Sequence, residues 1–246
     1  MSRDQLARAW HIALKDIRTY YLKPPLISWG MLFPAVMILA FYLRSPGDIR
    51  ALAPGLVALT VLFGATSVEA VVIAFEKRIG AMERLVMAPI SHAALLIGKG
   101  ASGALFGTMT GAIVWASASL ALGLALHPAA LLVIALGSVA FALLGVLIAL
   151  LMREVFDAMT VSNFVRFPMI FVCGVFMPFA SMAPALRVVA TVLPLSYTVD
   201  GLRHLMVSGN GSAFHLWLDL VAVAAFAALL YAACYRLLEH RLEELL

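Results

Sequence analysis

Six apolar stretches, each of about the length that crosses a lipid bilayer, dominate this 246-residue chain. A transmembrane helix needs roughly 20 predominantly apolar residues. The stretches cover about residues 26–43, 51–75, 100–126, 129–152, 158–180 and 214–235. A chain that is 64% hydrophobic and only 12% charged cannot coat a soluble domain with polar groups, so most of its surface must face lipid. The sequence predicts an all-α membrane protein with six transmembrane helices in one domain over residues 1–246.

Lysine and arginine are unevenly distributed among the segments that flank these stretches. Segments on one side of the membrane hold 13 of the 17 Lys and Arg residues, and the other side holds only Arg44, Arg50, Arg187 and Arg203. Cytoplasmic segments of membrane proteins carry such an excess of cations. We therefore expect both termini in the cytoplasm. The net charge of +4 then reflects membrane topology, and we expect no nucleic-acid partner.

Residues 2–22 form an amphipathic rather than a fully apolar pattern. One helix face carries Leu6, Trp10, Ala13, Leu14, Ile17 and Tyr21, and charged residues occupy the other faces. This pattern predicts a helix that lies along the membrane interface and ends before Lys23-Pro24-Pro25. A cleaved signal peptide fits less well, because the charged part is too long and no small-residue cleavage site follows the apolar run.

The segment 181–213, between the fifth and sixth stretches, is interrupted repeatedly by proline and glycine. Its apolar piece, Ala185–Leu193, is too short to span a bilayer. We expect it to enter the membrane and return, paired with a second short helix over Tyr197–Val207.

A dense charged segment, Phe75–Ser91, reads FEKRIGAMERLVMAPIS and follows the second apolar stretch. As a helix it places Ile79, Met82, Leu85 and Val86 on an apolar stripe, with most charges off that stripe. Such a helix is typical of docking into a groove on a soluble partner, although a solvated loop is an alternative. Pro89 should end the helix, and Ser91 could cap the next one.

The sequence lacks the common signatures of catalysis and nucleotide binding. It contains no GxxxxGK[ST], HExxH or GxSxG motif, and its six histidines have no metal-ligand spacing. We therefore expect no enzyme activity, metal or cofactor on this chain. Within the apolar stretches, Glu69 and the pair Asn163 and Arg166 are candidate substrate or gating groups. Snorkelling or pairing with a neighbouring cation is the favoured interpretation of Glu69.

Two signatures resemble the membrane subunit of the ABC-2 exporter family, especially the drug-export type. The first is Glu76-Lys77-Arg78-Ile79-Gly80 and Glu83-Arg84-Leu85, followed by Pro89-Ile90-Ser91 and Gly98-Lys99. The second comprises Asn163, Pro168, Gly174-Val175-Phe176-Met177-Pro178, Pro184, Pro194-Leu195-Ser196-Tyr197 and Asp200-Gly201-Leu202-Arg203. The run Leu52–Leu56 also fits. Two departures, Ala81 for the usual Thr and Cys173 for the usual Ser, argue against a polar role there.

The resemblance implies a half-transporter in the cytoplasmic membrane of a prokaryote, with an interfacial N-terminal helix, a cytoplasmic coupling helix and an external re-entrant pair. Its partners would be two copies of an ABC ATPase subunit, which bind the ATP and Mg²⁺, and a second copy of this permease or a homologous one. Coupling to the ATPase would involve Glu76, Arg78, Gly80, Glu83, Arg84, Leu85 and Pro89. Candidates for translocation or gating are Glu69, Asn163, Arg166, Phe176, Pro178, Pro194 and Tyr197.

The substrate is inferred only as a class. Few charges and many Phe, Leu, Met and Ala residues in the spans favour a hydrophobic or amphipathic compound, such as a drug-like molecule or a lipid. A polysaccharide or lipo-oligosaccharide is an alternative, because Trp29, Trp115, Tyr42 or Tyr197 could stack on sugars. An ion-coupled secondary transporter is disfavoured by the lack of ion-binding groups at the midplane, and an intramembrane enzyme by the lack of a catalytic constellation.

Overall fold

The computed structural model describes residues 2–21, 23, 32, 35–37, 39–40, 43, 49–152, 154–177, 179–207 and 212–243. These residues form helices and connecting turns, with no strand among them. The elements are α1 (Arg3–Asp16), η1 (Ile17–Tyr21), α3 (Ile49–Arg78), α4 (Ala81–Met87), α5 (His92–Leu122), α6 (Ala129–Leu151), α7 (Val155–Val172), η2 (Phe179–Ser181), α8 (Pro184–Thr191), α9 (Pro194–Met206) and α10 (Leu216–Glu243).

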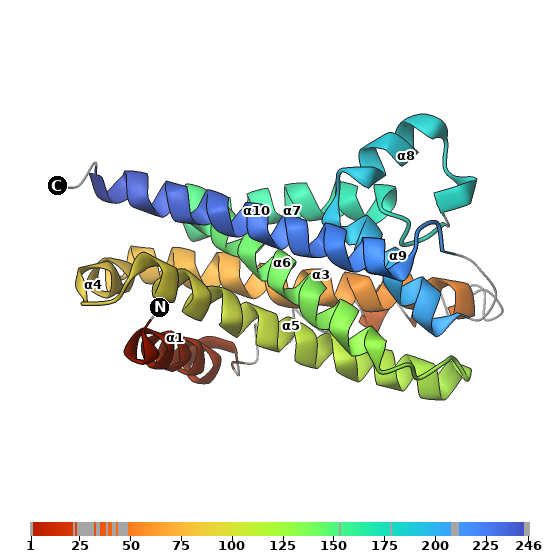
Figure 1. The fold of residues 1–246 in the computed structure, drawn as a ribbon, viewed down its shortest axis with the longest axis horizontal. Helices are drawn as coiled ribbons and strands as arrows, with labels where there is room; N and C mark the ends of the chain where they lie inside the picture. The colour runs from red at the N-terminus through yellow and green to blue at the C-terminus, as the bar shows by residue number, and fades with distance from the viewer. Residues whose placement is uncertain are drawn as a thin grey trace.

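The long helices run lengthwise side by side in one elongated bundle (Figure 1). In the described part of the chain, α3, α5, α6, α7 and α10 are long and apolar enough to cross a membrane. They correspond to the second through sixth predicted spans and confirm them as helices. The first predicted span, over residues 26–43, lies mostly outside the described residues.

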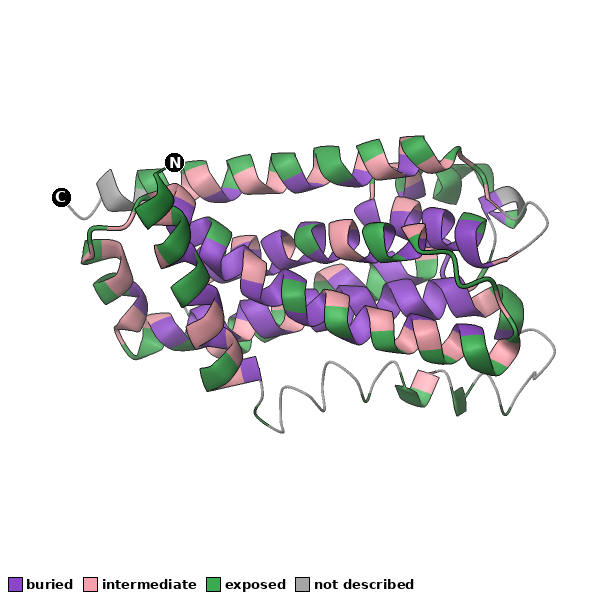
Figure 2. Ribbon diagram, turned by 60° about the horizontal axis from the view of Figure 1, so that its bottom comes forward, coloured by how far each residue is buried: buried purple, intermediate pink, exposed green. Residues whose placement is uncertain are grey.

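Helix α3 occupies the centre of the bundle. It packs against α5, α6, α7 and α9, and most of its residues from Ala53 to Ala74 are buried. Figure 2 shows buried residues concentrated in the middle of the bundle and exposed residues on the outer helices. Gly55 and Gly64 let neighbouring segments approach α3 closely, as small residues do between packed membrane helices.

Two glycines set helix ends that the pattern of apolar residues alone does not give. The predicted third and fifth stretches continue to residues 126 and 180, but α5 ends at Leu122 and α7 ends at Val172. Gly123 and Gly174 follow these ends with φ angles of 63° and 81°, in the left-handed region that favours glycine. Pro168, in contrast, is accommodated inside α7.

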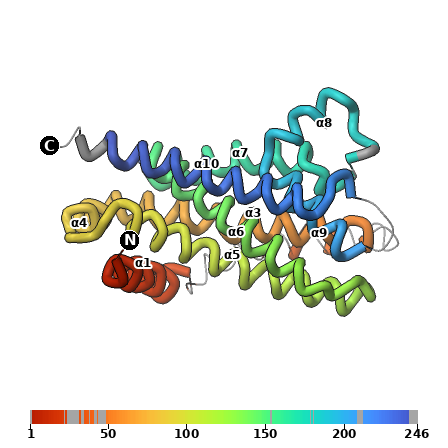
Figure 3. Tube along the Cα trace, viewed as in Figure 1, coloured from red at the N-terminus to blue at the C-terminus, as the bar shows by residue number. Residues whose placement is uncertain are grey.

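The predicted pair of short helices is present as α8 and α9. They lie near the far end of the bundle from α4, and their axes bend by 98° at the break between them (Figure 3). Together they pass the length and apolarity test for a broken span or a re-entrant loop. Their entry into the membrane and return remains a prediction. Helix α1 and the last turns of α10 lie at the same end as α4, which we call the α4 end (Figure 1).

Close approach of α6 to α3 depends on Gly145. A Cβ atom at this position would lie 2.6 Å from the Thr66 carbonyl oxygen and 3.1 Å from Cβ of Glu69. The backbone oxygen cannot move aside without displacing α3. A side chain at this position would therefore force the two central helices apart.

We expect Gly145→Ala to lower the free energy of unfolding by about 1–3 kcal/mol, because the added methyl group overpacks the α3–α6 contact. Thermal unfolding of the purified chain in detergent measures this effect. Gly201→Ala is the matched control, since its added Cβ would meet neighbours only at 3.4–3.5 Å. Equal stability of the two variants would show that α3 and α6 are not held this closely.

Candidate functional site

The charged segment forms a turn and a short helix at the α4 end. Helix α3 continues through Glu76 to Arg78, and Gly80 adopts a left-handed conformation with φ of 69°, which lets the chain turn into α4. Helix α4 ends at Met87, two residues before Pro89, as predicted. Ser91 caps α5, because its Oγ accepts a hydrogen bond of 3.2 Å from the Ala94 N–H.

The apolar stripe of this segment faces the protein's own core. Met82 is buried, and Leu85 and Val86 pack on a cluster that includes Ile73 of α3 and Leu238 of α10. The interpretation of this stripe as a free docking face is therefore wrong for Met82, Leu85 and Val86. The stripe attaches α4 to the bundle, and the periodicity that predicted an apolar face did not reveal what that face contacts.

The opposite face of the segment is exposed and carries charges of both signs. Arg78, Glu83, Arg84 and Pro89 are exposed, and the Arg84 guanidinium donates a hydrogen bond of 3.4 Å to the Ile79 carbonyl. Two apolar side chains on the same face are also exposed, Ile79 to 47% and Met87 to 87%. This surface, which we call the outer face of α4, combines an apolar anchor with charged groups, as protein-binding surfaces do.

Glu76 is predicted at the coupling site, but its side chain is fully buried beneath that surface. Its carboxylate forms ion pairs with Lys15 at 2.5 Å and with Lys99. Asp16 completes the group, at 2.7 Å from Lys99 and 2.8 Å from Lys15. We call Lys15, Asp16, Glu76 and Lys99 the charge quartet. It has no net charge and joins α1, α3 and α5.

Helix α1 makes further contacts with the segment after α4. The Arg8 guanidinium donates a hydrogen bond to the Pro89 carbonyl, and the Gln5 Oε1 accepts one of 3.0 Å from the Ser91 N–H. In α1, Ile12 and Ala13 are buried as part of its packing face, whereas Leu6 and Trp10 are more than half exposed. The predicted apolar face of α1 is thus divided between the bundle and the surroundings.

Lys77 fixes the same region to α6. Its ammonium donates hydrogen bonds to the carbonyls of Ala149, Leu150 and Met152, the last two at 3.0 Å. Carbonyls in the last turn of a helix have no partner within the helix, and a cation there also interacts favourably with the helix dipole. The start of the charged segment is therefore held by α1, α5 and α6 together.

The side chain of Lys15 is partly exposed, so water reaches its ammonium group. Burial lowers its pKa, but hydrogen bonds and charge interactions with Asp16 and Glu76 outweigh this effect and raise the pKa of Lys15 to about 12. Because the folded-state pKa exceeds the ordinary value of 10.5, its contribution to stability is complete below about pH 10.5 and is lost as pH rises through about 12. Lys15 therefore stays charged at neutral pH.

Glu69 is buried within the bundle rather than snorkelling to the interface. Its Oε1 accepts hydrogen bonds from the Tyr21 hydroxyl and, at 2.6 Å, from the Ser102 hydroxyl. Both hydrogen-bond donors are neutral hydroxyls, in contrast to the cation expected as its partner. Gly103 provides the space for Glu69, since a Cβ there would lie 2.5 Å from Cγ of Glu69. Glu69 thus connects η1 with α3 and α5.

Arg166 and Asn163 are brought together on α7. The Arg166 guanidinium donates hydrogen bonds to the Asn163 Oδ1 at 2.8 Å, to the Ser162 carbonyl at 3.0 Å and to the Ser67 hydroxyl. It also lies over the Phe63 ring, 4.6 Å from its centroid. None of the described carboxylates pairs with Arg166. This arrangement fixes α7 to α3.

The remaining gate candidates lie at the other end of the bundle. Phe176 packs against the core and against the Phe171 ring, with centroids 5.7 Å apart. Pro194 is buried at the start of α9, and the Tyr197 hydroxyl donates a hydrogen bond of 2.8 Å to the Thr191 carbonyl. Pro178 lies outside the described residues. The candidates therefore do not form one cluster: Glu69 lies toward the α4 end, and Phe176, Pro194 and Tyr197 toward α8.

The sequence-based site omitted Lys15, Asp16 and Lys99 of the quartet, and Tyr21 and Ser102 beside Glu69. Asp16 gives a usable signal, because on a helix it lies one turn beyond Ile12 and Ala13, the buried part of the packing face of α1. Lys99 gives another, since it lies within the continuous helix α5. Asp16 and Lys99 are 83 residues apart, so their pairing cannot be predicted from the residues around either of them.

The fold defines a multi-pass helical membrane protein whose charged segment, Phe75–Ser91, is packed against the spans. Residues 8–207 match the family profile of ABC-2 type transporters. The match covers most of the chain, and the chain belongs to this family, whose members are membrane transport domains of ABC transporters rather than catalytic ones. No curated protein matched the chain.

We expect Lys99→Met to lower the free energy of unfolding by about 3–5 kcal/mol, because two buried carboxylates then share only Lys15. Adding Glu76→Gln should recover much of this loss, since Lys15 and Asp16 remain as a balanced pair. Thermal unfolding of the single and double variants in detergent measures the coupling. Lys23→Met, at an exposed lysine, serves as the control and should change little. Additive effects of the two substitutions would contradict the quartet.

Proposed function

We propose that this chain is the permease subunit of an ATP-driven exporter in the cytoplasmic membrane of a prokaryote, with both termini and α4 in the cytoplasm. Two permease subunits, either two copies of this chain or this chain and a homologue, pair with two copies of a separate ABC ATPase subunit. That ATPase binds ATP and Mg²⁺. The observation that carries the proposal is the exposed, charged outer face of α4, presented by a helix whose other face is packed on the bundle, in a member of the ABC-2 family.

The outer face of α4 provides the contact with the ATPase. Arg78, Glu83 and Arg84 offer charges of both signs to complementary groups, and the exposed Met87 offers an apolar anchor. Leu85 and Gly80 serve indirectly, since Leu85 attaches α4 to the core and Gly80 permits the turn that presents it. Glu76 acts beneath the surface, as part of the charge quartet.

The charge quartet and Lys77 hold the end of α3 against α1, α5 and α6, and the packing of Met82, Leu85 and Val86 attaches α4 to this unit. A displacement of α4 by the ATPase therefore moves these helices together rather than bending a loop. Because α3 is the central helix of the bundle, its movement reaches α7 and α9 through direct packing. This route joins the coupling site to the Arg166 and Tyr197 regions, where gating residues are expected.

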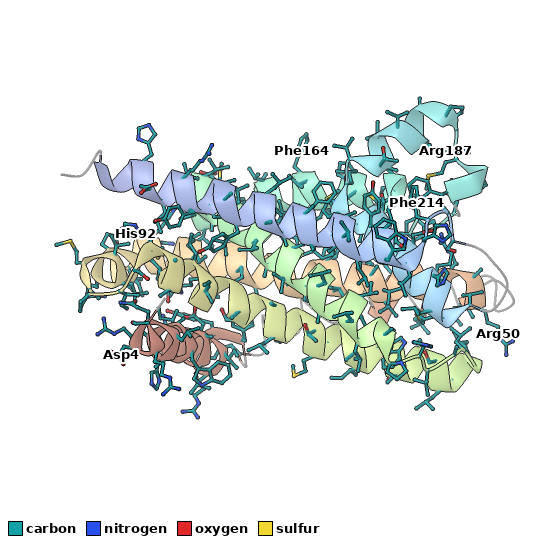
Figure 4. All side chains as sticks on the ribbon, viewed as in Figure 1. Asp4, Arg50, His92, Phe164, Arg187 and Phe214 are labelled. Carbon is teal, nitrogen blue, oxygen red and sulfur yellow. The ribbon has the colours of Figure 1, made fainter. Side chains whose placement is uncertain are left out.

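The substrate class is a hydrophobic or amphipathic compound, a drug-like molecule or a lipid. Glu69 and Arg166 support this choice, because each forms hydrogen bonds with neighbouring residues of the protein. A polysaccharide or lipo-oligosaccharide is the second candidate, favoured by the aromatic group of Tyr197, Phe214 and Phe226, with ring centroids 5.5 and 6.2 Å from that of Tyr197 (Figure 4 labels Phe214). ATP dependence of transport in vesicles distinguishes both from an ion-coupled secondary transporter.

We expect the double substitution Glu83→Lys and Arg84→Glu to reduce co-purification of the ATPase by about tenfold, because it reverses the charge pattern while keeping the net charge. Transport in vesicles should fall with it, whereas membrane insertion and thermal stability should not change, since both side chains are exposed. Pull-down of a candidate ABC ATPase subunit that is co-expressed with this chain and vesicle transport provide the two measurements.

The matched control is Glu239→Lys with Arg236→Glu, an equivalent exchange of exposed charges near the α4 end of α10. This control should retain both ATPase binding and transport. Unchanged pull-down and transport in the α4 variant would contradict the proposal that the outer face of α4 contacts the ATPase.

A further inference from the structure

Helix α1, which starts at the N mark in Figure 2, runs across the long helices and packs on the side of α5. The contact is close at Gly98, where a Cβ atom would lie 2.8 Å from the Ala9 carbonyl oxygen. Helix α5 has 31 residues, so it is about 46 Å long and extends about 8 Å beyond each side of a roughly 30 Å hydrocarbon core. Gly98 follows the first residue of α5 by six residues, or about 9 Å. Helix α1 is therefore held where the hydrocarbon core meets the headgroups.

The side of α1 that is turned away from the bundle, which we call the outer face of α1, is exposed. Arg3, Leu6 and Trp10 are spaced at i, i+3 and i+7, so they lie on one side of the helix. Leu6 is 53% exposed and Trp10 is 54% exposed. Leu14 continues this side as a partly exposed residue, and Arg18, one turn farther along in η1, is exposed. The outer face of α1 is thus an apolar strip with an arginine at each end.

The exposed charges around this strip are predominantly positive. Within the described residues 2–23, Arg3, Arg18 and Lys23 are exposed cations, and Asp4 is the only exposed carboxylate. Anionic headgroups attract Lys and Arg residues that are held near the membrane surface, and tryptophan rings favour the same level of the bilayer. The outer face of α1 therefore matches an anionic membrane surface in both charge and polarity.

We propose that the outer face of α1 binds anionic phospholipids, with acyl chains against Leu6 and Trp10 and phosphates at Arg3 and Arg18. A phosphate diester accepts charge-assisted hydrogen bonds from a guanidinium, which a zwitterionic lipid offers with less net attraction because its ammonium group offsets the charge. This surface is distinct from the outer face of α4, and the proposal does not depend on coupling to an ATPase.

Lipid on the outer face of α1 also bears on the opposite side of the helix. There, Arg8 and Gln5 form hydrogen bonds with Pro89 and Ser91, directly after α4, and the charge quartet joins α1 to α3 and α5. The lipid contact and these internal contacts hold α1 in the same position. Anionic lipid therefore stabilises the attachment of α1 to the bundle.

Quenching of tryptophan fluorescence by brominated acyl chains tests the contact. The full chain is placed in nanodiscs of equal parts dioleoyl phosphatidylglycerol and dioleoyl phosphatidylcholine, with bromine on the chains of one lipid or of the other. The quenching that is lost in Trp10→Phe belongs to Trp10. We expect brominated phosphatidylglycerol to quench Trp10 more strongly than brominated phosphatidylcholine, because the arginines concentrate the anionic lipid beside it.

Arg3→Ala combined with Arg18→Ala should lower this preference by about fivefold for each arginine lost, the effect of one cation at an anionic membrane surface. Arg3→Lys combined with Arg18→Lys should keep most of it, because the charge remains. Arg236→Ala, which removes an exposed arginine of α10 near the α4 end, is the matched control and should keep the preference. An unchanged preference in the double alanine variant would overturn the proposal.

Two further results bear on the same surface. Thermal unfolding of the wild type should occur at a higher temperature in nanodiscs with phosphatidylglycerol than in phosphatidylcholine alone, and the double alanine variant should lose this difference. Absence of the difference in the wild type would contradict the stabilisation of α1 by lipid. If neither brominated lipid quenches Trp10 and an added ABC ATPase subunit changes its fluorescence, the outer face of α1 belongs to the ATPase contact and the lipid proposal is wrong.

Discussion

The buried charge quartet is the interaction on which the α4 end of this protein depends. Asp16, Glu76 and Lys99 are buried and Lys15 is partly exposed; burial of charges is unfavourable unless each is paired, and here each carboxylate contacts both ammonium groups. We therefore expect removal of one carboxylate together with one ammonium group to cost less stability than removal of a single charged group. Because its members come from α1, α3 and α5, the same balance that permits burial also fixes the N-terminal helix to the spans.

Helix α4, at the same end of the bundle, has two different faces. Its inner face packs through Met82, Leu85 and Val86, and its outer face remains exposed with Glu83 and Arg84. A short helix of seven residues has little stability of its own, so the tertiary contacts keep it folded. The exposed charges are consequently presented on a rigid surface, which is the property that the proposed transfer of motion from an ATPase requires.

Glu69 and Arg166, which lie deeper in the bundle, also form hydrogen bonds within the protein. Glu69 accepts hydrogen bonds from two hydroxyls, and Arg166 donates to an amide, a hydroxyl and a carbonyl. Glycines beside α3 allow the approach that makes such contacts possible, as Gly103 does for Glu69. In an apolar environment an unpaired polar group is costly, so these residues join helices as well as serving any role in transport.

The sequence by itself determined the membrane class, the second to sixth spans, the helix break at Pro89 and the cap at Ser91. These follow from composition, apolar length and local backbone chemistry, which act over a few residues. Only the tertiary structure decided that the α4 stripe faces inward, that Glu76 is buried and that Lys99 pairs with Asp16. Periodicity shows that a helix has an apolar face, but the identity of the surface covering that face depends on segments distant in sequence. For the quartet, those segments are 61 and 83 residues apart, and only packing of the helices brings them together.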